Sequence, residues 1–596
     1  MCRGCFSTLF LNDDLYAGGS AGVFACDELR PTRRNFMAFS VAAAGAAGTI
    51  GGPHLAMAAD GAAADVIFTG GKIIPIPGAA SVEALAVGGG KILAVGAKAT
   101  VAGLQSKDTR IVDLDGRVMM PGFIDPHNHT VLASLITELL TDVGYTKFPT
   151  RAKLIAELRS MAARTPPGQW ISCANFDNLL QGGDLSREDL DGVSTSHPIY
   201  VWYTNGHDAC VNSMALKLAG ISGDIGTLPG GGHFGRDDEG QLNGLVYEES
   251  ALLKFVPLAL PKITPELAIK AVGDFLRSVA ATGNTAVHEP GTLRSEWIAR
   301  FAKLSPHGAC RTSASLMYED MKGYEPYRSL GLGAKAMQFP NSLFSLYGVK
   351  IVGDGSNQTE TAAQTAPYLG TERKGTPNFD AQQMKEMVAA VKAASLPVLI
   401  HCNGDHTVDI ALDAIEAAYG SSTAQGINRI EHATMARPDQ IRRMKTLNVQ
   451  PSFLMNHVRF YGAAYRDQIF GPARAAFTDP AGACVKAGLP FTLHTDSPCS
   501  PLGSLALVGT AITRKCVIDG STIGADQAVT LDQGLRAITI NAAHQIGLGD
   551  RIGSLEKGKE ADLVILESDP YRTPPEKLGD IKVGETWVAG EMKYSG

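Results

Sequence analysis

The sequence predicts an α/β protein in which a (β/α)8 TIM barrel carries a small β-sandwich domain built from both ends of the mature chain. Eight apolar runs of strand length follow residue 118, with helical patterns between them. Polar residues of metal-binding types end several of these runs. Short β runs with glycine turns precede the first barrel strand and recur near the end of the sequence. Because parallel barrel strands all open at one mouth, residues that end different runs can converge there.

The predicted barrel strands follow one another at intervals that leave room for helices. They cover residues 118–127, 285–288, 311–316, 346–352, 397–401, 430–432, 449–453 and 489–496. Helical patterns occupy 381–394 and 407–418. Thr264-Pro265 is a start signal for an amphipathic helix that leads into the second strand.

The first two strands are separated by far more residues than a simple βα unit needs. Residues 131–263 are therefore predicted to form a long insertion after strand 1, within a barrel that covers 119–545. The insertion contains a helical pattern and a β run at 198–203. Its glycine cluster at 230–232 lacks the Lys-Ser/Thr of a phosphate-binding loop, so we interpret it as a turn.

The β-sandwich is predicted to combine residues 59–118 with residues 546–596. Its first part has short β runs separated by glycines, including Gly88-Gly89-Gly90. The partner strands are expected beyond the barrel, at 561–566 and 586–588.

Composition favours an enzyme that acts on small molecules. The chain has 596 residues, of which 45% are apolar and 19% charged, so it can bury a large core. A net charge of −7 provides no basic patch, and we expect neither nucleic acid nor a membrane surface as a partner. The sequence leaves homo-oligomerisation open.

Residues 1–58 have the features of an export leader. Arg33-Arg34 precedes an alanine-rich apolar stretch and then Ala56-Met57-Ala58, a small-x-small cleavage pattern. This order predicts a twin-arginine signal and a periplasmic location; the alternative is a disordered leader with a chance arginine pair. The residues before the signal leave a later translation start open. The seven cysteines beyond residue 58 form an odd, scattered set, unlike a disulfide framework.

The candidate site begins at the end of the first predicted strand, where His127 and His129 share a strand face. Imidazole is a common ligand of divalent metals, yet surface histidines also occur at this spacing by chance. His401, His432 and Asp496 end later runs in the same manner. Together the five residues offer nitrogen and oxygen ligands that suit zinc, manganese or iron.

These motifs resemble those of the metal-dependent amidohydrolase superfamily. The resemblance is carried by Gly122-Phe-Ile-Asp-x-His-x-His129, by the two later histidines, by the turn at 495–498 and by 553–564, and it runs from about residue 65 to the end of the sequence. Within the superfamily, 350–356 and 401–405 resemble the long-chain branch that includes N-substituted formamide deformylases.

The resemblance implies a further ligand, Lys350, carboxylated so that it bridges two metal ions. An unmodified ammonium has no lone pair and would repel cations. The alternative is a lysine that forms a salt bridge with Asp354 or faces outward. In the two-ion arrangement, His127, His129 and Asp496 hold one ion; the other ion is held by His401 and His432. Without carboxylation we expect one ion.

We expect a hydrolase that cleaves a carbon–nitrogen bond other than a peptide bond, in a linear amide such as an N-acyl or N-formyl amine. Metal-bound hydroxide would attack the carbonyl, and Asp496 would pass the proton to the departing nitrogen. Two alternatives remain: a mononuclear deaminase or cyclic-amide hydrolase, and a periplasmic binding protein without turnover.

Four further polar residues are candidates near the site, and three of them have two readings. His207 either contacts substrate from the insertion or makes local hydrogen bonds. His494 shares a face with Asp496 and points either into the site or into the core. His288 ends the second strand and is a candidate to support the ligands, and Asp354 either orients neighbours or caps a turn.

Overall fold

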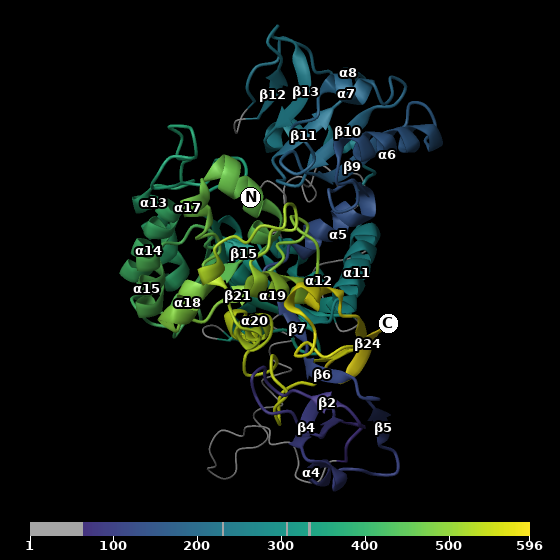
Figure 1. Cartoon of the computed structure of the whole chain (residues 1–596), viewed down its shortest axis with the longest axis vertical. Helices are drawn as coiled ribbons and strands as arrows, with labels where there is room; N and C mark the ends of the chain where they lie inside the picture. Colours follow the sequence, from purple (N-terminus) through teal and green to yellow (C-terminus); the bar gives the residue numbers. More distant parts are fainter. Residues whose placement is uncertain (1–62, 229–231, 292, 306–307, 332–334) are drawn as a thin grey trace.

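The computed structural model describes residues 63–228, 232–291, 293–305, 308–331 and 335–596. The predicted twin-arginine leader at 1–58 lies outside the described residues, as do Gly230 and Gly231 of the glycine cluster. Three layers follow one another along the long axis of Figure 1: the insertion at the top, the barrel in the middle and the β-sandwich at the bottom.

The barrel is a sheet of eight parallel strands that follow one another in chain order, which confirms the predicted fold class. Each predicted run contributes one strand. The strands are β7 (Phe123–Asp125), β14 (Asn284–Pro290), β15 (Arg311–Met317), β17 (Phe344–Val352), β18 (Val398–Cys402), β19 (Arg429–His432), β20 (Gln450–Phe453) and β21 (Thr492–Leu493). The short β16 (Met337–Gln338) pairs antiparallel with β17.

Hydrogen bonds just beyond the strands close the barrel between β21 and β7. The Asp496 N–H donates to the His127 carbonyl at 3.0 Å, and the His129 N–H donates to the Ser497 carbonyl at 2.9 Å. The carboxyl group of Asp125 accepts from the Thr495 N–H at 3.1 Å. The two predicted histidines and the predicted aspartate are therefore joined through their own backbones.

The single strand predicted over 118–127 is wrong, because the chain changes sheets in the middle of this run. β6 (Val118–Pro121) belongs to the β-sandwich, and β7 starts the barrel after Gly122. A Cβ at Gly122 would lie 2.2 Å from the Thr285 Cγ2, so only glycine fits where the chain crosses. Both strands are fully buried, and a continuous apolar run cannot show which sheet each half joins.

The β-sandwich consists of two sheets and combines both ends of the described chain, as predicted. The first sheet has the order β4-β3-β1-β5 and the second β2-β6-β22-β23-β24. Phe68, Met119, Leu563 and Trp587 lie in the shared core. The strands are β1 (Val66–Thr69), β2 (Lys72–Ile73), β3 (Ala84–Gly88), β4 (Lys91–Gly96), β5 (Arg110–Asp113), β22 (Leu563–Leu566), β23 (Val583–Val588) and β24 (Glu591–Ser595).

A buried ion pair joins the sandwich to the barrel. Arg311 on β15 is 3% exposed and donates to the Asp562 carboxylate from Nε at 2.7 Å and from Nη2 at 2.9 Å. Asp562 also accepts from the Ala589 N–H at 2.8 Å. A paired geometry of this kind compensates the cost of burying both charges.

The insertion has a sheet of its own, with the order β12-β13-β11-β10-β9-β8. In Figure 1 it stands above the barrel, while α5 (Thr130–Leu139) runs beside α11 (Pro265–Ala281) against the barrel. The Thr264 side chain caps α11 by accepting from the Leu267 N–H at 3.2 Å. The insertion contains β8 (Thr141–Asp142), α6 (Arg151–Arg164), β9 (Ile171–Phe176), α7 (Arg187–Asp191), β10 (Ile199–Tyr203), β11 (Asp208–Val211), α8 (Ser213–Leu218), β12 (His233–Arg236) and β13 (Leu242–Tyr247).

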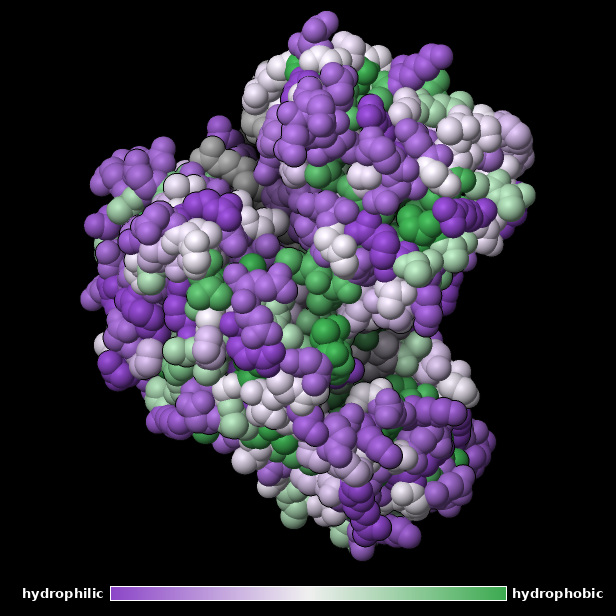
Figure 2. Space-filling view, turned by 45° about the horizontal axis from the view of Figure 1, so that its top comes forward, coloured by the Kyte–Doolittle hydropathy of each residue, from purple (hydrophilic) through white to green (hydrophobic). Residues whose placement is uncertain are grey.

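Helices between the later strands cover the outside of the barrel. They include α12 (Ile298–Leu304), α13 (Ala381–Ala393), α14 (Asp405–Tyr419), α15 (Pro438–Leu447), α18 (Ala481–Ala487), α19 (Ser504–Thr513), α20 (Leu531–Ala537) and α21 (Ile540–Gln545). Across the described residues, we find no helix with the length and apolar character that a bilayer span requires. The face in Figure 2 is mainly hydrophilic, with apolar residues in patches.

Candidate functional site

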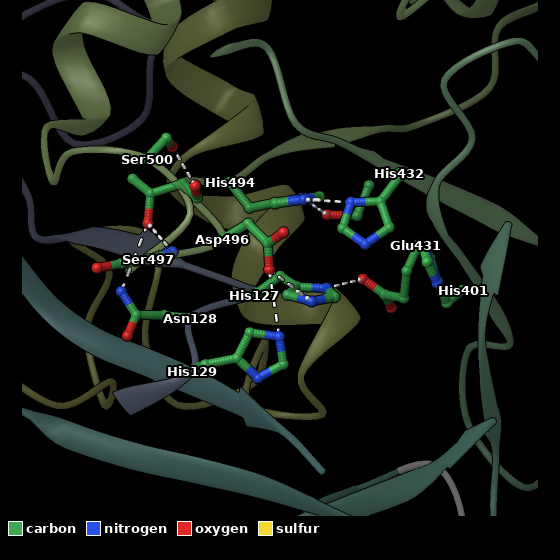
Figure 3. Close-up of polar contacts among 12 residues, drawn as sticks. His127, Asn128, His129, His401, Glu431, His432, His494, Asp496, Ser497 and Ser500 are labelled. Atoms are coloured by element: carbon green, nitrogen blue, oxygen red, sulfur yellow. Dashed lines mark hydrogen bonds and ion pairs between the residues drawn. The ribbon is translucent and has the colours of Figure 1, made fainter. Parts of the chain in front are cut away.

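His127, His129 and Asp496 meet at the carboxyl end of the barrel, where Figure 3 shows their side chains pointing toward one another. The Asp496 Oδ1 lies 3.2 Å from the His127 Nε2 and 3.3 Å from the His129 Nε2. Among the described residues, neither Asp496 Oδ1 nor His127 Nε2 makes a well-formed hydrogen bond, although both atoms are buried. Buried donor atoms that converge without hydrogen bonds fit a metal ion between them.

A second donor group shares His127 and adds His432 and His494. The His494 Nε2 lies 3.2 Å from the His432 Nδ1, and its Nδ1 lies 2.7 Å from the Ser452 hydroxyl. Of the two readings of His494, the structure supports the one that points into the site. His401 is adjacent, with its ring centroid 4.6 Å from that of His432. Its Nε2 lies 2.8 Å from the Asn403 amide, which leaves Nδ1 as the nitrogen that could face an ion.

Unusual backbone angles at the site redirect two of these side chains. Asp496 has a φ of 56° and His432 a φ of 67°, both in the left-handed region that non-glycine residues rarely adopt. Glu431 and His432 would point to opposite faces on a regular strand. The left-handed turn brings His432 back toward the mouth. Such conformations cost roughly 1–3 kcal/mol each and occur preferentially at functional sites.

Glu431 is a functional residue that sequence reasoning missed. Its Oε2 lies 2.6 Å from the His127 Nδ1 and accepts from the Arg429 Nη2 at 2.9 Å. Both Glu431 and Arg429 are fully buried. A carboxylate behind a ligating imidazole fixes its tautomer and orientation. The sequence contains one signal for Glu431: the two-residue period of a strand places it on the same face as Arg429.

Glu289, also missed, lies behind His129 at the end of β14. It accepts from the Val131 N–H at 3.0 Å, and its Oε1 is 3.7 Å from the His129 Nδ1. This second distance is longer than a hydrogen bond. Glu289 therefore anchors the start of α5 and adds negative potential beside His129.

Burial and mutual contacts set the charges in the site. Burial tends to raise the pKa of Asp496, but the contacts with His127 and His129 outweigh it and hold that pKa well below its usual range. Burial, reinforced by Lys350, lowers the pKa of His127. Burial also acts to lower the pKa of His129, yet contacts with Asp496 and Glu289 raise it overall. Asp496 is therefore ionised at neutral pH and can accept a proton.

Lys350 is only 3% exposed, on β17 inside the barrel, so it does not face outward. Burial lowers the pKa of its ammonium group. Among the described residues it forms no ion pair with Asp354, so neither alternative reading of Lys350 describes the structure. Burial lowers the pKa of His127, His401 and His432, and the charge of Lys350 acts in the same direction on each.

Asp354 supports the site from behind, and His288 is buried on β14. The Asp354 carboxylate accepts from the backbone N–H groups of Asn403 at 3.0 Å and Gly404 at 2.9 Å, and this fixes the turn after His401. Burial raises the pKa of Asp354 to about 6. The His288 Nδ1 lies 3.1 Å from the Ser313 hydroxyl oxygen. Among the described residues, its buried Nε2 has no hydrogen-bond partner.

A cavity of about 800 Å³ opens above the donor groups. His401, His432 and Asp496 lie in its wall, together with His207 from the insertion. His207 is 8% exposed, and its Nδ1 lies 3.2 Å from Glu248. His207 therefore makes the local contact of one reading and lines the space above the site, while its contact with substrate stays a prediction. The insertion forms part of the cavity, as a cap on the barrel mouth would.

The residues fit a divalent metal ion. The donors are imidazole nitrogens and a carboxylate oxygen, the types that zinc and other first-row ions prefer. His127, His129 and Asp496 form the group that contains the carboxylate, and Glu431 supplies the outer contact that metal-bound histidines usually have.

Comparisons with known proteins agree with this fold and site. The model of the amidohydrolase family matches residues 110–594. The chain is 26% identical over 527 residues to an N-substituted formamide deformylase of Arthrobacter pascens, covering 86% of this chain and 95% of that protein. It is 25% identical over 550 residues to the Protein LONG AFTER FAR-RED 3 of Arabidopsis thaliana, covering 90% and 92%.

A solved structure shares the fold. An uncharacterized metal-dependent hydrolase from Pyrococcus furiosus superposes with a TM-score of 0.64 at 23% identity, covering 85% of this chain and all of that one. The family match spans most of the chain, including the histidine pair, the later strand ends and the C-terminal motif. The chain therefore belongs to the amidohydrolase family and is a hydrolase with a histidine-rich candidate metal centre.

Proposed function

We propose that this enzyme hydrolyses a linear, non-peptide amide, such as an N-formyl or N-acyl amine, to a carboxylate and a free amine. The observation that carries the proposal is an ionised Asp496 between two imidazoles at the base of a large cavity. The likeness to an N-substituted formamide deformylase over almost the whole length of both chains supports the substrate class.

The residues divide the work as follows. His127, His129 and Asp496 would hold a divalent ion, which when bound lowers the pKa of water from about 15.7 toward 7 and polarises the substrate carbonyl. Asp496 takes one proton from the attacking water as its oxygen bonds to the carbonyl carbon. The carbon–nitrogen bond then breaks, and Asp496 delivers the proton to the departing nitrogen.

We further propose that the ion is zinc, and that carboxylated Lys350 bridges to a second ion held by His401 and His432. A lysine must be neutral to add carbon dioxide, and burial lowers the pKa of Lys350 in the required direction. One observation favours a single ion instead: among the described residues, His401, the expected ligand of the second ion, lies in neither donor group. A mononuclear deaminase or cyclic-amide hydrolase is therefore the second candidate.

The test is hydrolysis of a panel of N-substituted formamides and acetamides by zinc-loaded protein, with formate or acetate and free amine both quantified. Equal amounts of acid and amine are expected. In a parallel panel of amino-substituted heterocycles and cyclic amides, release of ammonia or a ring-opened single product would support the second candidate. Binding without any product in either panel would indicate a binding protein. Asp496→Asn should lower kcat by at least about 1,000-fold with most of the metal retained. Turnover within tenfold of the parent would contradict the role of Asp496.

A further inference from the structure

His457 is an imidazole in the wall of the cavity that belongs to neither donor group. It starts η6 (His457–Tyr461), the π-helical turn after β20, and it is 2% exposed. It lines the same cavity as His432, with the two ring centroids 6.4 Å apart. The proton transfers assigned to Asp496 do not use His457, so we infer its role from the groups that it contacts.

The contacts of the His457 Nδ1 show which nitrogen carries the proton. Nδ1 lies 3.2 Å from the Thr434 hydroxyl. That hydroxyl donates to the Asn403 Oδ1 at 2.7 Å. The orientation of Asn403 is fixed because its other amide atom lies 2.9 Å from the Gly355 carbonyl, which can only accept. With its hydrogen committed, the Thr434 oxygen can only accept from His457.

Asp479 is the second acceptor for the same proton. Its Oδ1 lies 3.4 Å from the His457 Nδ1, and its side chain is fully buried. Burial raises the pKa of Asp479, and the neighbouring His457 and Arg514 act against that rise. Arg514 is fully buried and donates to the Asp479 carbonyl at 3.1 Å. Burial lowers the pKa of Arg514 only to about 10, so it remains a cation, and the negative charges of Asp479 and Asp526 act to raise that pKa.

Two acceptors at Nδ1 place the hydrogen on that nitrogen, so the neutral ring has its lone pair on Nε2. Nε2 makes no hydrogen bond with any described residue, whereas Nδ1 is turned into the protein. The cavity therefore contains a fixed hydrogen-bond acceptor beside the candidate metal centre. An amide substrate offers one donor near its reacting carbon, the N–H of a secondary amide.

We propose that the His457 Nε2 accepts a hydrogen bond from the N–H of the scissile amide, and that the enzyme selects secondary amides over tertiary ones. This inference rests on the proposed amide hydrolysis and adds a specificity to it. His457 positions the carbon–nitrogen bond, while Thr434 and Asp479 hold its tautomer. A tertiary amide leaves the Nε2 lone pair without a partner and brings a methyl group against it, which costs about 10- to 100-fold in kcat/KM.

The test compares N-cyclohexylformamide with N-cyclohexyl-N-methylformamide, measured as formate release by zinc-loaded enzyme. The parent should favour the secondary amide by about 10- to 100-fold in kcat/KM. His457→Phe keeps an aromatic ring against Tyr465, whose centroid lies 5.8 Å away, and removes the acceptor. The His457→Phe variant should lose activity only on the secondary amide. The ratio of kcat/KM for the secondary amide to that for the tertiary amide should then fall below about threefold. His457→Gln offers an acceptor oxygen and should restore part of the preference.

Each outcome decides between the claims. Equal rates on both amides by the parent, or a His457→Phe variant that keeps the preference, would overturn the inference and leave amide hydrolysis intact. Absence of formate and acetate release from every amide in the panel would refute the proposed function, and the inference would fall with it. Circular dichroism and zinc content of both variants show whether a loss of rate reflects the acceptor or the fold.

Discussion

Glu431→Gln offers the sharpest test of the outer layer of the candidate metal centre. The Glu431 Oε2 lies 2.6 Å from the His127 Nδ1, and both side chains are fully buried. A hydrogen bond to a charged group contributes about 1.5–3 kcal/mol, roughly twice that of a neutral pair. Glutamine keeps the shape of the side chain and offers a neutral acceptor. The variant should therefore lose about half of this contribution, or roughly 1–1.5 kcal/mol of zinc-binding free energy. That loss corresponds to about a tenfold weaker zinc affinity.

The assay is zinc affinity measured by competition with a chromophoric chelator, because affinity reports on the centre without requiring a known substrate. Glu289→Gln is the matched control. Its carboxylate lies 3.7 Å from the His129 Nδ1, beyond hydrogen-bond reach, so the affinity should change less than about threefold. Arg429 also loses its charged partner in Glu431→Gln, and thermal unfolding of the metal-free variants corrects for any loss of fold. Equal affinities for Glu431→Gln and the parent, or a larger loss in Glu289→Gln, would refute the reasoning.

Three further outcomes follow from the same structure. Lys350→Ala should lower the zinc content, by plasma mass spectrometry, from about two ions per chain to about one, and an unchanged content would make Lys350 a bystander. Asp562→Ala leaves the buried Arg311 with Glu560 as its remaining anionic contact among the described residues. The free energy of unfolding should therefore fall by about 3 kcal/mol, seen as a lower melting temperature. An unchanged melting temperature would show that the pair is not stabilising. We also propose that Arg33→Lys with Arg34→Lys keeps the protein in the cytoplasm, which cell fractionation checks; export as in the parent would exclude the twin-arginine signal.

The strand-end residues could be predicted because two simple rules place them. A two-residue period puts His127 and His129 on one face, and parallel strands bring His401, His432 and Asp496 to the same mouth. The structure gathers these residues at one end of the barrel. The sequence could not show the left-handed angles at His432 and Asp496, which decide where each side chain points.

The residues that support the site were harder to find because their partners are distant in the sequence. Glu431 contacts His127 from 304 positions away in the sequence. His457 and Asp479 come from different turns of the chain, and neither lies in a recognisable motif. Local patterns give the direction of a side chain on its own strand, whereas these contacts depend on how whole elements pack.

The order of strands in the β-sandwich has a consequence for synthesis of the chain. β22 lies between β6 and β23, so the edge of β6 has no neighbour on that side until residues after 562 have left the ribosome. Arg311 also lacks Asp562 until the same point in synthesis. A nascent chain therefore carries an open strand edge through most of its translation, which favours aggregation. Completion of the fold is tied to the last segment made, so a chain that is cut short cannot complete its sandwich.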